Sequence, residues 1–256
     1  MKILTAGLTH KGLVRKTNQD CFLVCDQSPS LYIVADGIGG NLAGEVASRM
    51  AVDIIKDHIS SVRSGDQPYM NGFDRSLSES RNRLTSAIQL ANHIIYLASK
   101  EKTEWKGMGT TVAAAWLSKR NEPNLTIGHV GDSRIFLIRN NTIRQLTKDH
   151  SIRVERRQND FLQVSTHALG PQIKNYLSRA VGTDKNVCVD TREIKILPQD
   201  RFLLASDGLT NMISDEVILK ILCSENNPES ASQHLIDAAK KNGGRDNITV
   251  IVIHSK

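Results

Sequence analysis

A buried strand that ends in an acid and a group of glycines constrains this chain more than any other feature. Residues 32–40 (YIVADGIGG) begin as a short apolar run with β-branched side chains, which predicts a buried strand. Asp36 closes the run, and Gly37, Gly39 and Gly40 follow it. Because glycine bends the backbone without a side chain in the way, this stretch predicts a carboxylate and a bare carbonyl at the lip of a sheet.

The same pattern returns further along the chain. Residues 202–208 (FLLASDG) repeat the strand, acid and glycine around Asp207, and Asp246 stands just before the β-prone run 248–253. A single Asp-Gly pair is most simply a turn. Three acids at strand ends are hard to explain as three independent turns, so the pattern favours a site for a hard cation.

The chemistry of these donors favours magnesium or manganese. Carboxylates, a glycine carbonyl and water are all oxygen donors, which suit Mg²⁺ or Mn²⁺ better than zinc. Two such ions that share one bridging acid, about 3.5–4 Å apart, activate water and clamp a phosphoryl group. Arg15 adds a guanidinium that can grip two phosphate oxygens at once. Taken alone, Arg15 is better explained by a surface ion pair with Asp20 or Glu45.

Composition places the chain among ordinary globular proteins. Its 256 residues are 39% hydrophobic and 23% charged, which suits one domain. No apolar run reaches the length of about 20 residues that a membrane helix needs, and the N-terminus lacks a signal-peptide pattern. We therefore expect a cytoplasmic protein without a membrane segment. The four cysteines form no Cys-x-x-Cys pair, which predicts reduced and mostly buried thiols.

Hydrophobic periodicity predicts alternating blocks of strands and helices. The expected helices cover residues 46–59, 77–98, 214–224 and 229–241. The expected strands cover residues 1–8, 22–24, 31–35, 110–117, 125–130, 134–139, 142–146, 193–197, 202–205 and 248–253, the second and third forming a hairpin. Residues 150–176 are polar and weakly periodic, which predicts a mobile excursion.

Eight motifs follow one another from near residue 12 to the C-terminus. They are 14–20 (VRKTNQD), 34–40 (VADGIGG), 107–111 (GMGTT), 130–134 (VGDSR), 146–151 (LTKDHS), 177–182 (LSRAVG), 205–208 (ASDG) and 245–249 (RDNIT). In this order they resemble the metal-dependent Ser/Thr protein phosphatases of the PPM, or type 2C, family in its compact bacterial form. Each motif is weak alone, and the eight together are highly specific.

The resemblance implies an α+β fold in which two packed antiparallel sheets carry helices on both outer faces, an α/β/β/α sandwich. Residues 1–256 would form a single phosphatase domain with a mobile flap at about 150–176. Two Mn²⁺ or Mg²⁺ ions would lie at one edge of the sandwich. By position, Asp36 would bridge both ions, Asp207 and Asp246 would complete the first, and the Gly37 carbonyl would join Asp36 on the second.

The resemblance also implies roles around these ions. Asp20 would orient metal-bound water, and Arg15 would hold the substrate phosphate. Asp132 matches the acid that helps to bind a weaker third ion in bacterial members. Ile38 stands where many eukaryotic relatives have a histidine proposed as general acid, which leaves the leaving-group acid unassigned. His150 is an alternative for that role, although a structural role is the simpler interpretation.

The implied activity is hydrolysis of phosphoserine and phosphothreonine on proteins by direct attack of metal-bridging water or hydroxide. The implied partners are phosphorylated proteins and a Ser/Thr kinase whose action the enzyme reverses, and we expect a monomer. An inactive phosphoprotein-binding module would have lost its metal acids, yet Asp36, Asp207 and Asp246 are all present. A hydrolase of small phosphate esters stays open, whereas scattered basic residues and 4% aromatic content count against nucleic acid.

Overall fold

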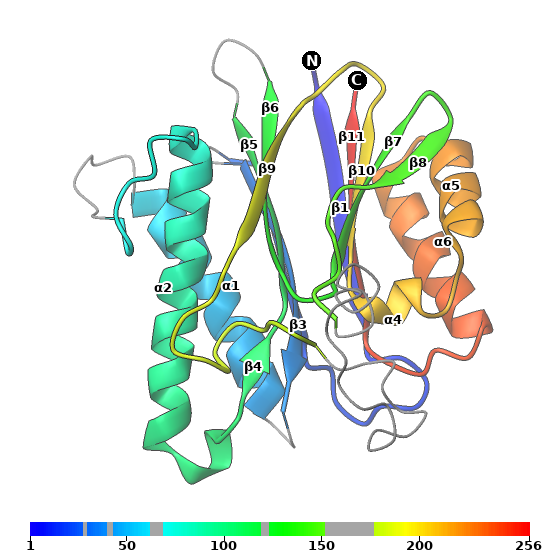
Figure 1. Ribbon diagram of the computed structural model, residues 1–256. Coiled ribbons are helices and arrows are strands. Elements are labelled where there is room, and N and C mark those ends of the chain that lie inside the picture. The colour runs from blue at the N-terminus through cyan, green and yellow to red at the C-terminus, as the bar shows by residue number, and fades with distance from the viewer. Residues whose placement is uncertain (28–29, 40–42, 62–68, 119–122, 152–176) are drawn as a thin grey trace, which may run out of the picture.

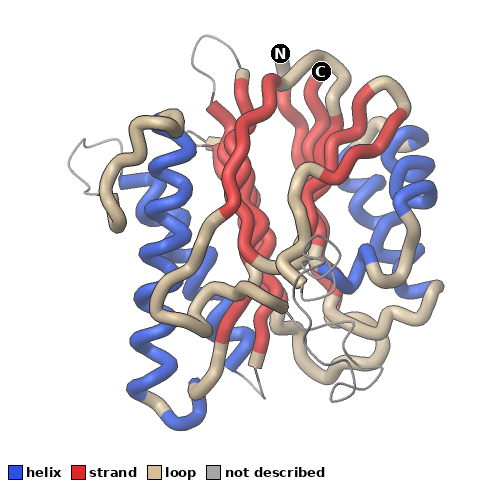
Figure 2. Tube along the Cα trace, in the orientation of Figure 1, coloured by secondary structure: helices blue, strands red, loops and turns tan. Residues whose placement is uncertain are grey.

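Two antiparallel sheets pack face to face, and helices cover both outer faces (Figures 1 and 2). The computed structural model describes residues 1–27, 30–39, 43–61, 69–118, 123–151 and 177–256 of the chain. The architecture confirms the α+β sandwich predicted from the sequence.

The first sheet has the strand order β1-β11-β10-β7-β8. Its strands are β1 (Ile3–His10), β11 (Ile248–Ser255), β10 (Arg201–Ala205), β7 (Arg134–Arg139) and β8 (Thr142–Gln145). Strand β11 pairs with β1 on one side and β10 on the other, and all of its residues are buried. This position explains why the C-terminal run is continuously apolar rather than alternating.

The second sheet has the strand order β2-β3-β5-β6-β9. Its strands are β2 (Asp20–Cys25), β3 (Ser30–Ile38), β5 (Val112–Ser118), β6 (Asn124–Val130) and β9 (Asp190–Lys195). The short strand β4 (Gly109–Thr110) pairs with the end of β3. The expected pairing of β2 with β3 is confirmed, and its register places Asp20 opposite Asp36.

Helices from two parts of the chain form the outer layers. Helices α1 (Ala43–Ser61) and α2 (Glu79–Glu101) cover the second sheet, and a short 3₁₀ helix, η2 (Thr103–Trp105), follows α2 (Figure 1). Helices α4 (Asp207–Thr210), α5 (Asp215–Ser224) and α6 (Pro228–Lys241) lie on the first sheet. The Asn227 side chain caps α6 by accepting from the Glu229 amide at 2.9 Å.

Three apolar layers hold the sandwich together. One lies between α1, α2 and the second sheet, where Ile55, Ile88 and Ile33 are fully buried. The central layer lies between the sheets, and the third lies between the first sheet and α4–α6. Hydrophobic burial at these layers fixes the strands, and it thereby fixes the strand ends that carry the acids.

Some expectations differ from the structure. Strand β9 begins at Asp190 rather than near residue 193, and α4 was not expected. The thiols are not mostly buried: Cys188 is exposed, and the other three cysteines are only partly buried. Among the described residues, no helix has the length and apolar character needed to cross a membrane. The single-domain organisation stays a prediction, and residues 152–176 of the expected flap lie outside the described residues.

Candidate active site

Asp36 lies near the end of β3, where the sheet hydrogen bonds change partner. Strand β5 pairs with β3 as far as Val34, and β4 takes over at Gly37. The Asp36 amide donates to Thr111 Oγ1 at 3.0 Å. The Asp36 carbonyl accepts from the Thr111 amide at 2.8 Å and from Thr110 Oγ1 at 2.9 Å. The two threonines therefore fix the backbone from which the Asp36 carboxylate projects.

Both Asp-Gly pairs need glycine because another backbone segment packs directly against them. A Cβ on Gly37 would collide with the carbonyl oxygen of Gly44, and the Gly37 amide donates to the Gln19 carbonyl at 3.1 Å. A Cβ on Gly208 would collide with the carbonyl oxygen of Asn247. The glycines thus let separate chain segments meet at the edge where the acids lie.

Asp207 follows β10 and is the first residue of α4. Its Oδ2 accepts from Asn211 Nδ2 at 3.0 Å. Its Oδ1 is buried and has no hydrogen-bond partner among the described residues. A carboxylate oxygen that is buried without a donor needs a cation or ordered water to compensate for lost hydration.

Asp246 lies just before β11, in a loop that Asn247 ties to the N-terminal part of the chain. Asn247 Nδ2 donates to the carbonyls of Lys11 at 3.0 Å and Thr17 at 2.9 Å. Asn247 Oδ1 accepts from the Gln19 amide at 2.8 Å. These bonds hold the loop between β1 and β2 against the start of β11. The loop and Asp246 therefore lie side by side at the site.

Arg15 projects from that loop and forms an ion pair with Asp246. Its Nη2 lies 2.7 Å from Asp246 Oδ2, and its side chain is 56% exposed. The simpler alternative, a surface pair with Asp20 or Glu45, is wrong, because Glu45 pairs with Arg49 and Asp20 is buried among other partners. Arg15 is therefore a solvent-accessible guanidinium beside an acid of the site.

Asp20 is buried beneath the other acids. Its Oδ2 accepts from Thr249 Oγ1 at 2.6 Å and Ser206 Oγ at 2.8 Å. Its Oδ1 is buried without a hydrogen-bond partner among the described residues. Burial raises the pKa of Asp20 and the charges of Asp207 and Asp246 add to this rise, whereas the two hydroxyl bonds oppose it.

Asp132 follows β6 and stays free of the arginine nearest to it in sequence. Arg134 donates to Asp149 through Nε at 3.0 Å and through Nη2 at 2.7 Å. The Arg134 guanidinium therefore binds the carboxylate of Asp149 rather than that of Asp132. Burial, followed by the charges of Asp207 and Asp149, raises the pKa of Asp132 to about 7.

These residues meet around a pocket with a volume of about 660 Å³. Six of the seven predicted site residues line it, namely Arg15, Asp36, Gly37, Asp132, Asp207 and Asp246. Asp20 does not line the pocket. The structure thus gathers the acids in one place, while their individual roles stay a prediction.

Burial and the neighbouring acids disfavour the charged forms of Asp36 and Asp207. Burial raises the pKa of Asp36 well above its ordinary value, and Asp20, Asp207, Asp132 and Asp246 raise it further. Burial, followed by the charge of Asp246, also raises the pKa of Asp207. Buried oxygens that repel one another and lack donors fit a site for hard divalent cations.

The side chains would have to adjust to enclose an ion. Within the described ranges, no three acidic, His or Cys side chains are grouped closely enough to form a coordination cluster as they stand. Asp246 is held by Arg15 at 2.7 Å, which draws this carboxylate towards the solvent-exposed guanidinium. Both carboxylate oxygens of Asp246 have a donor, since its Oδ1 also accepts from the Asn247 amide at 2.9 Å.

Sequence reasoning gave no role to the segment that closes one side of the pocket. Residues 177–180, Thr183 and Asp184 also line it. Arg179 Nη1 donates to Asp190 Oδ1 at 3.0 Å, and His150 Nε2 lies 3.2 Å from Asp190 Oδ2. His150 Nδ1 accepts from the Gly131 amide at 3.1 Å, which supports its structural interpretation. The matched motif at 177–182 was the available signal, although it indicated no chemistry.

Comparisons with known proteins agree with this geometry. A family model described as Protein phosphatase 2C matches residues 10–238. The serine/threonine phosphatase stp of Listeria welshimeri is 36% identical over 248 residues, covering 96% of this chain and 93% of that protein. The solved Streptococcus agalactiae serine/threonine phosphatase superposes with a TM-score of 0.83 at 32% identity over the full length of both chains.

The fold and the gathered acids agree with the class of metal-dependent protein phosphatases. This chain belongs to the protein phosphatase 2C family. Another similar structure is the catalytic domain of PstP in complex with two manganese ions, with a TM-score of 0.76 and 29% identity over 98% of this chain and 97% of that one.

Proposed function

We propose that this protein hydrolyses phosphoserine and phosphothreonine on other proteins by direct attack of water in a metal-dependent reaction. The observation that carries the proposal is the pocket in which Asp36, Asp207 and Asp246 meet beside Arg15. Three acids from distant parts of the chain converge there. Burial and the neighbouring carboxylates raise the pKa of Asp36 and of Asp207, which suits cation-dependent phosphoryl chemistry.

The acids and one carbonyl supply the ligands. Asp36 would bridge two ions, Asp207 and Asp246 would hold the first, and the Gly37 carbonyl would join Asp36 on the second. Two divalent cations bound there would lower the pKa of water and neutralise charge on the phosphoryl group. The oxygen donor set suits Mn²⁺ or Mg²⁺, and Asp132 would help to hold a weaker third ion.

The remaining residues position water and substrate. Asp20 is held by Thr249 and Ser206 through one oxygen, so its other oxygen is left to accept a hydrogen bond from water. Arg15 would leave Asp246 and donate two parallel hydrogen bonds to the substrate phosphate. Water is the proposed nucleophile because the described lining residues include no cysteine or histidine that would form a covalent intermediate.

The proposed partners follow from this reaction. They are phosphorylated proteins and the Ser/Thr kinase whose action the enzyme would reverse. We extend the proposal to a monomeric, cytoplasmic protein that acts as one domain. All four cysteines are free, which suits a reducing compartment.

A comparison of substrates tests the proposal against hydrolysis of small esters. Phosphothreonine and phosphoserine peptides, a phosphorylated protein and an aryl phosphate would be assayed with and without added Mn²⁺. We expect Mn²⁺-dependent release of phosphate from all of them, with the higher kcat/KM on the peptides and the protein. Turnover confined to the aryl phosphate and other small esters would contradict the proposed substrate class.

A further inference from the structure

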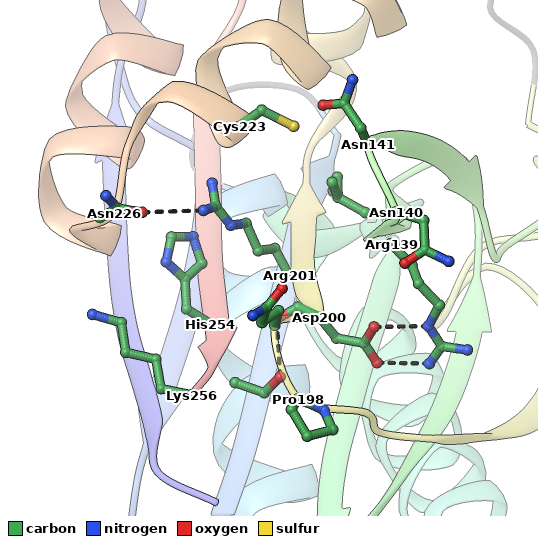
Figure 3. A pocket seen from close by; sticks show the side chains of 13 residues that line it. Arg139, Asn140, Asn141, Pro198, Asp200, Arg201, Cys223, Asn226, His254 and Lys256 are labelled. Carbon is green, nitrogen blue, oxygen red and sulfur yellow. Dashed lines mark hydrogen bonds and ion pairs between the residues drawn. The ribbon is translucent and has the colours of Figure 1, made fainter.

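A second hollow, with a volume of about 500 Å³, lies at the end of the sandwich opposite to the acidic pocket, and Figure 3 shows its lining. Strands β10 and β11 run from the acidic pocket at one end of the sandwich to the hollow at the other end. Arg201 begins β10 and Asp207 follows its end, while Asp246 precedes β11 and His254 lies near its end. The hollow is therefore a separate place in the fold, and its volume is typical of small-molecule sites.

The only acidic side chain among the described residues that line this hollow is already neutralised. Arg139 donates to Asp200 through Nε at 2.7 Å and through Nη2 at 2.6 Å. The Leu197 amide donates to Asp200 Oδ2 at 2.8 Å. These three bonds satisfy the buried carboxylate, so the charge of Asp200 does not offset the other two cations, Arg201 and Lys256.

Arg201 and Lys256 have no acidic side-chain partner among the described residues. Arg201 donates to the Glu225 carbonyl at 3.0 Å and to Asn226 Oδ1 at 3.3 Å, and both acceptors are uncharged. Within the described part of the chain, no ion pair includes Arg201 or Lys256. Two positively charged side chains therefore belong to the lining of one cavity, and neither is paired with an acidic side chain of the described residues.

His254 lies next to both cations, and their positive charges contribute to its lowered pKa (Figure 3). It is 3% exposed, and its Nε2 is buried without a hydrogen-bond partner among the described residues. Burial, followed by the charges of Arg201 and Lys256, lowers the pKa of His254 to about 4, against a hydrogen bond to the Asn226 backbone. An anion in the hollow would offset this positive field.

The lining also limits the shape of the occupant. Asn140 and Asn141, both with positive φ in the turn between β7 and β8, add side-chain amides to the lining on the side of Arg139 (Figure 3). No Phe, Tyr or Trp side chain is among the described residues that line the hollow, and the imidazole of His254 is only 3% exposed, so a nucleobase would find no exposed ring to stack on. We propose that the hollow binds a compact anion carrying phosphate groups, such as a phosphorylated sugar, between Arg201 and Lys256.

Nuclear magnetic resonance on the Mg²⁺-loaded protein tests this site directly. Inorganic phosphate, a sugar bisphosphate and the uncharged sugar would each be titrated while backbone amide signals are followed. The two anions should shift the amides of Arg201, Asn226 and Ser255, with a dissociation constant of about 1 mM or tighter for the bisphosphate. Signals of Gly37 and Gly39 report separately on anions in the acidic pocket, so the two sites are distinguishable.

Two variants connect binding to the cations. Lys256→Gln should weaken bisphosphate binding at the hollow about tenfold, because one charge-assisted contact is lost. Lys220→Gln, an exposed change on α5 outside the lining, should leave binding unchanged. Arg201→Lys keeps the charge and loses the planar fork, so it should also weaken binding while the melting temperature reports whether α5 stays anchored. Turnover without the anion should be unchanged in Lys256→Gln.

The pKa of His254 gives a second readout. Bound bisphosphate should raise this pKa in the wild-type protein, since a negative charge then faces the imidazole. The proposal is overturned if saturating bisphosphate shifts only the signals of the acidic pocket. It is equally overturned if binding at the hollow is as tight in Lys256→Gln as in the wild type. Neither result bears on the phosphatase activity.

Discussion

Arg15 Nη2 lies 2.7 Å from Asp246 Oδ2, so the residue proposed to grip phosphate contacts an acid proposed to hold an ion. The contact joins residues 231 positions apart in the sequence. A cation bound at Asp246 would compete with Arg15 for the negative charge of this carboxylate. Cation binding would release the guanidinium towards the pocket, where a substrate phosphate would take the place of the carboxylate.

Arg15→Ala should raise KM for a phosphopeptide about tenfold or more and lower kcat less, because Arg15 is proposed to hold phosphate in ground and transition states alike. Mn²⁺ affinity should be unchanged or tighter, since Asp246 loses its competing cation. Arg245→Ala removes an exposed neighbouring charge and serves as the matched control. An unchanged KM with a collapsed kcat would assign Arg15 another role.

Asp207→Asn and Asp246→Asn should each lower kcat/KM on the order of 100-fold or more, because each removes a ligand charge. Calorimetric titration should find fewer Mn²⁺ ions bound than in the wild type. The metal-free Asp207→Asn protein should melt no lower than the wild type. The substitution removes the carboxylate of Asp207, whose charged form is disfavoured by burial and by the charge of Asp246. Asp53→Asn, an exposed change on α1, is the control. Near wild-type turnover at saturating Mn²⁺ would show that the assignment of Asp207 and Asp246 to the first ion is wrong.

Asp132→Ala should keep two-ion binding and the melting temperature while kcat on phosphopeptides falls about 100-fold. This expectation rests on Asp132 lining the pocket while Arg134 is held by Asp149. Metal stoichiometry, melting temperature and kcat would be measured on the same preparation, with Asp132→Asn as a second variant. A loss of activity explained wholly by unfolding would make Asp132 a structural residue.

The buried, neutral side chain of His129 leads us to expect a loss of stability in mild acid. It is 1% exposed, neither ring nitrogen has a hydrogen-bond partner among the described residues, and its ring centroid lies 4.7 Å from that of His150. Burial, followed by the charge of His150, lowers the pKa of His129 to about 3. The unfolded histidine titrates near 6.5, so the unfolded state binds more protons below that pH.

The free energy of unfolding should therefore be highest above about pH 6.5 and fall as the pH drops towards 3, by about 2 kcal/mol from His129 between pH 7 and pH 5. Urea unfolding of the wild type and of His129→Phe at both pH values measures this difference. The variant should lose less stability than the wild type on acidification, whereas a change at exposed His234 should behave as the wild type. Equal losses in wild type and His129→Phe would refute the prediction.

The sequence predicted those parts of the fold that depend on local periodicity. Strand β11 and helix α2 were expected because apolar side chains recur at strand or helix spacing over many residues. Helix α4 was missed because four residues are too few to show a helical period. The early start of β9 was missed because Asp190 is polar and its place is fixed by pairing with His129.

The acids could be identified from the sequence, and their partners could not. The pattern of strand, acid and glycine indicates Asp36 and Asp207. This pattern reflects the close approach of another backbone segment at Gly37 and at Gly208. The pair between Arg15 and Asp246 depends on two loops that meet only after both sheets have formed. Long-range contacts of this kind leave no trace in local spacing.

The most direct test of the central claim is phosphate release from a phosphothreonine peptide by exhaustively chelated protein, before and after Mn²⁺ is added back. We expect no measurable turnover after chelation and full recovery with Mn²⁺, because an all-oxygen site holds such ions only moderately and exchanges them. The Asp207→Asn protein should not recover in the same assay. Full turnover by the chelated wild-type protein would contradict the metal-dependent mechanism.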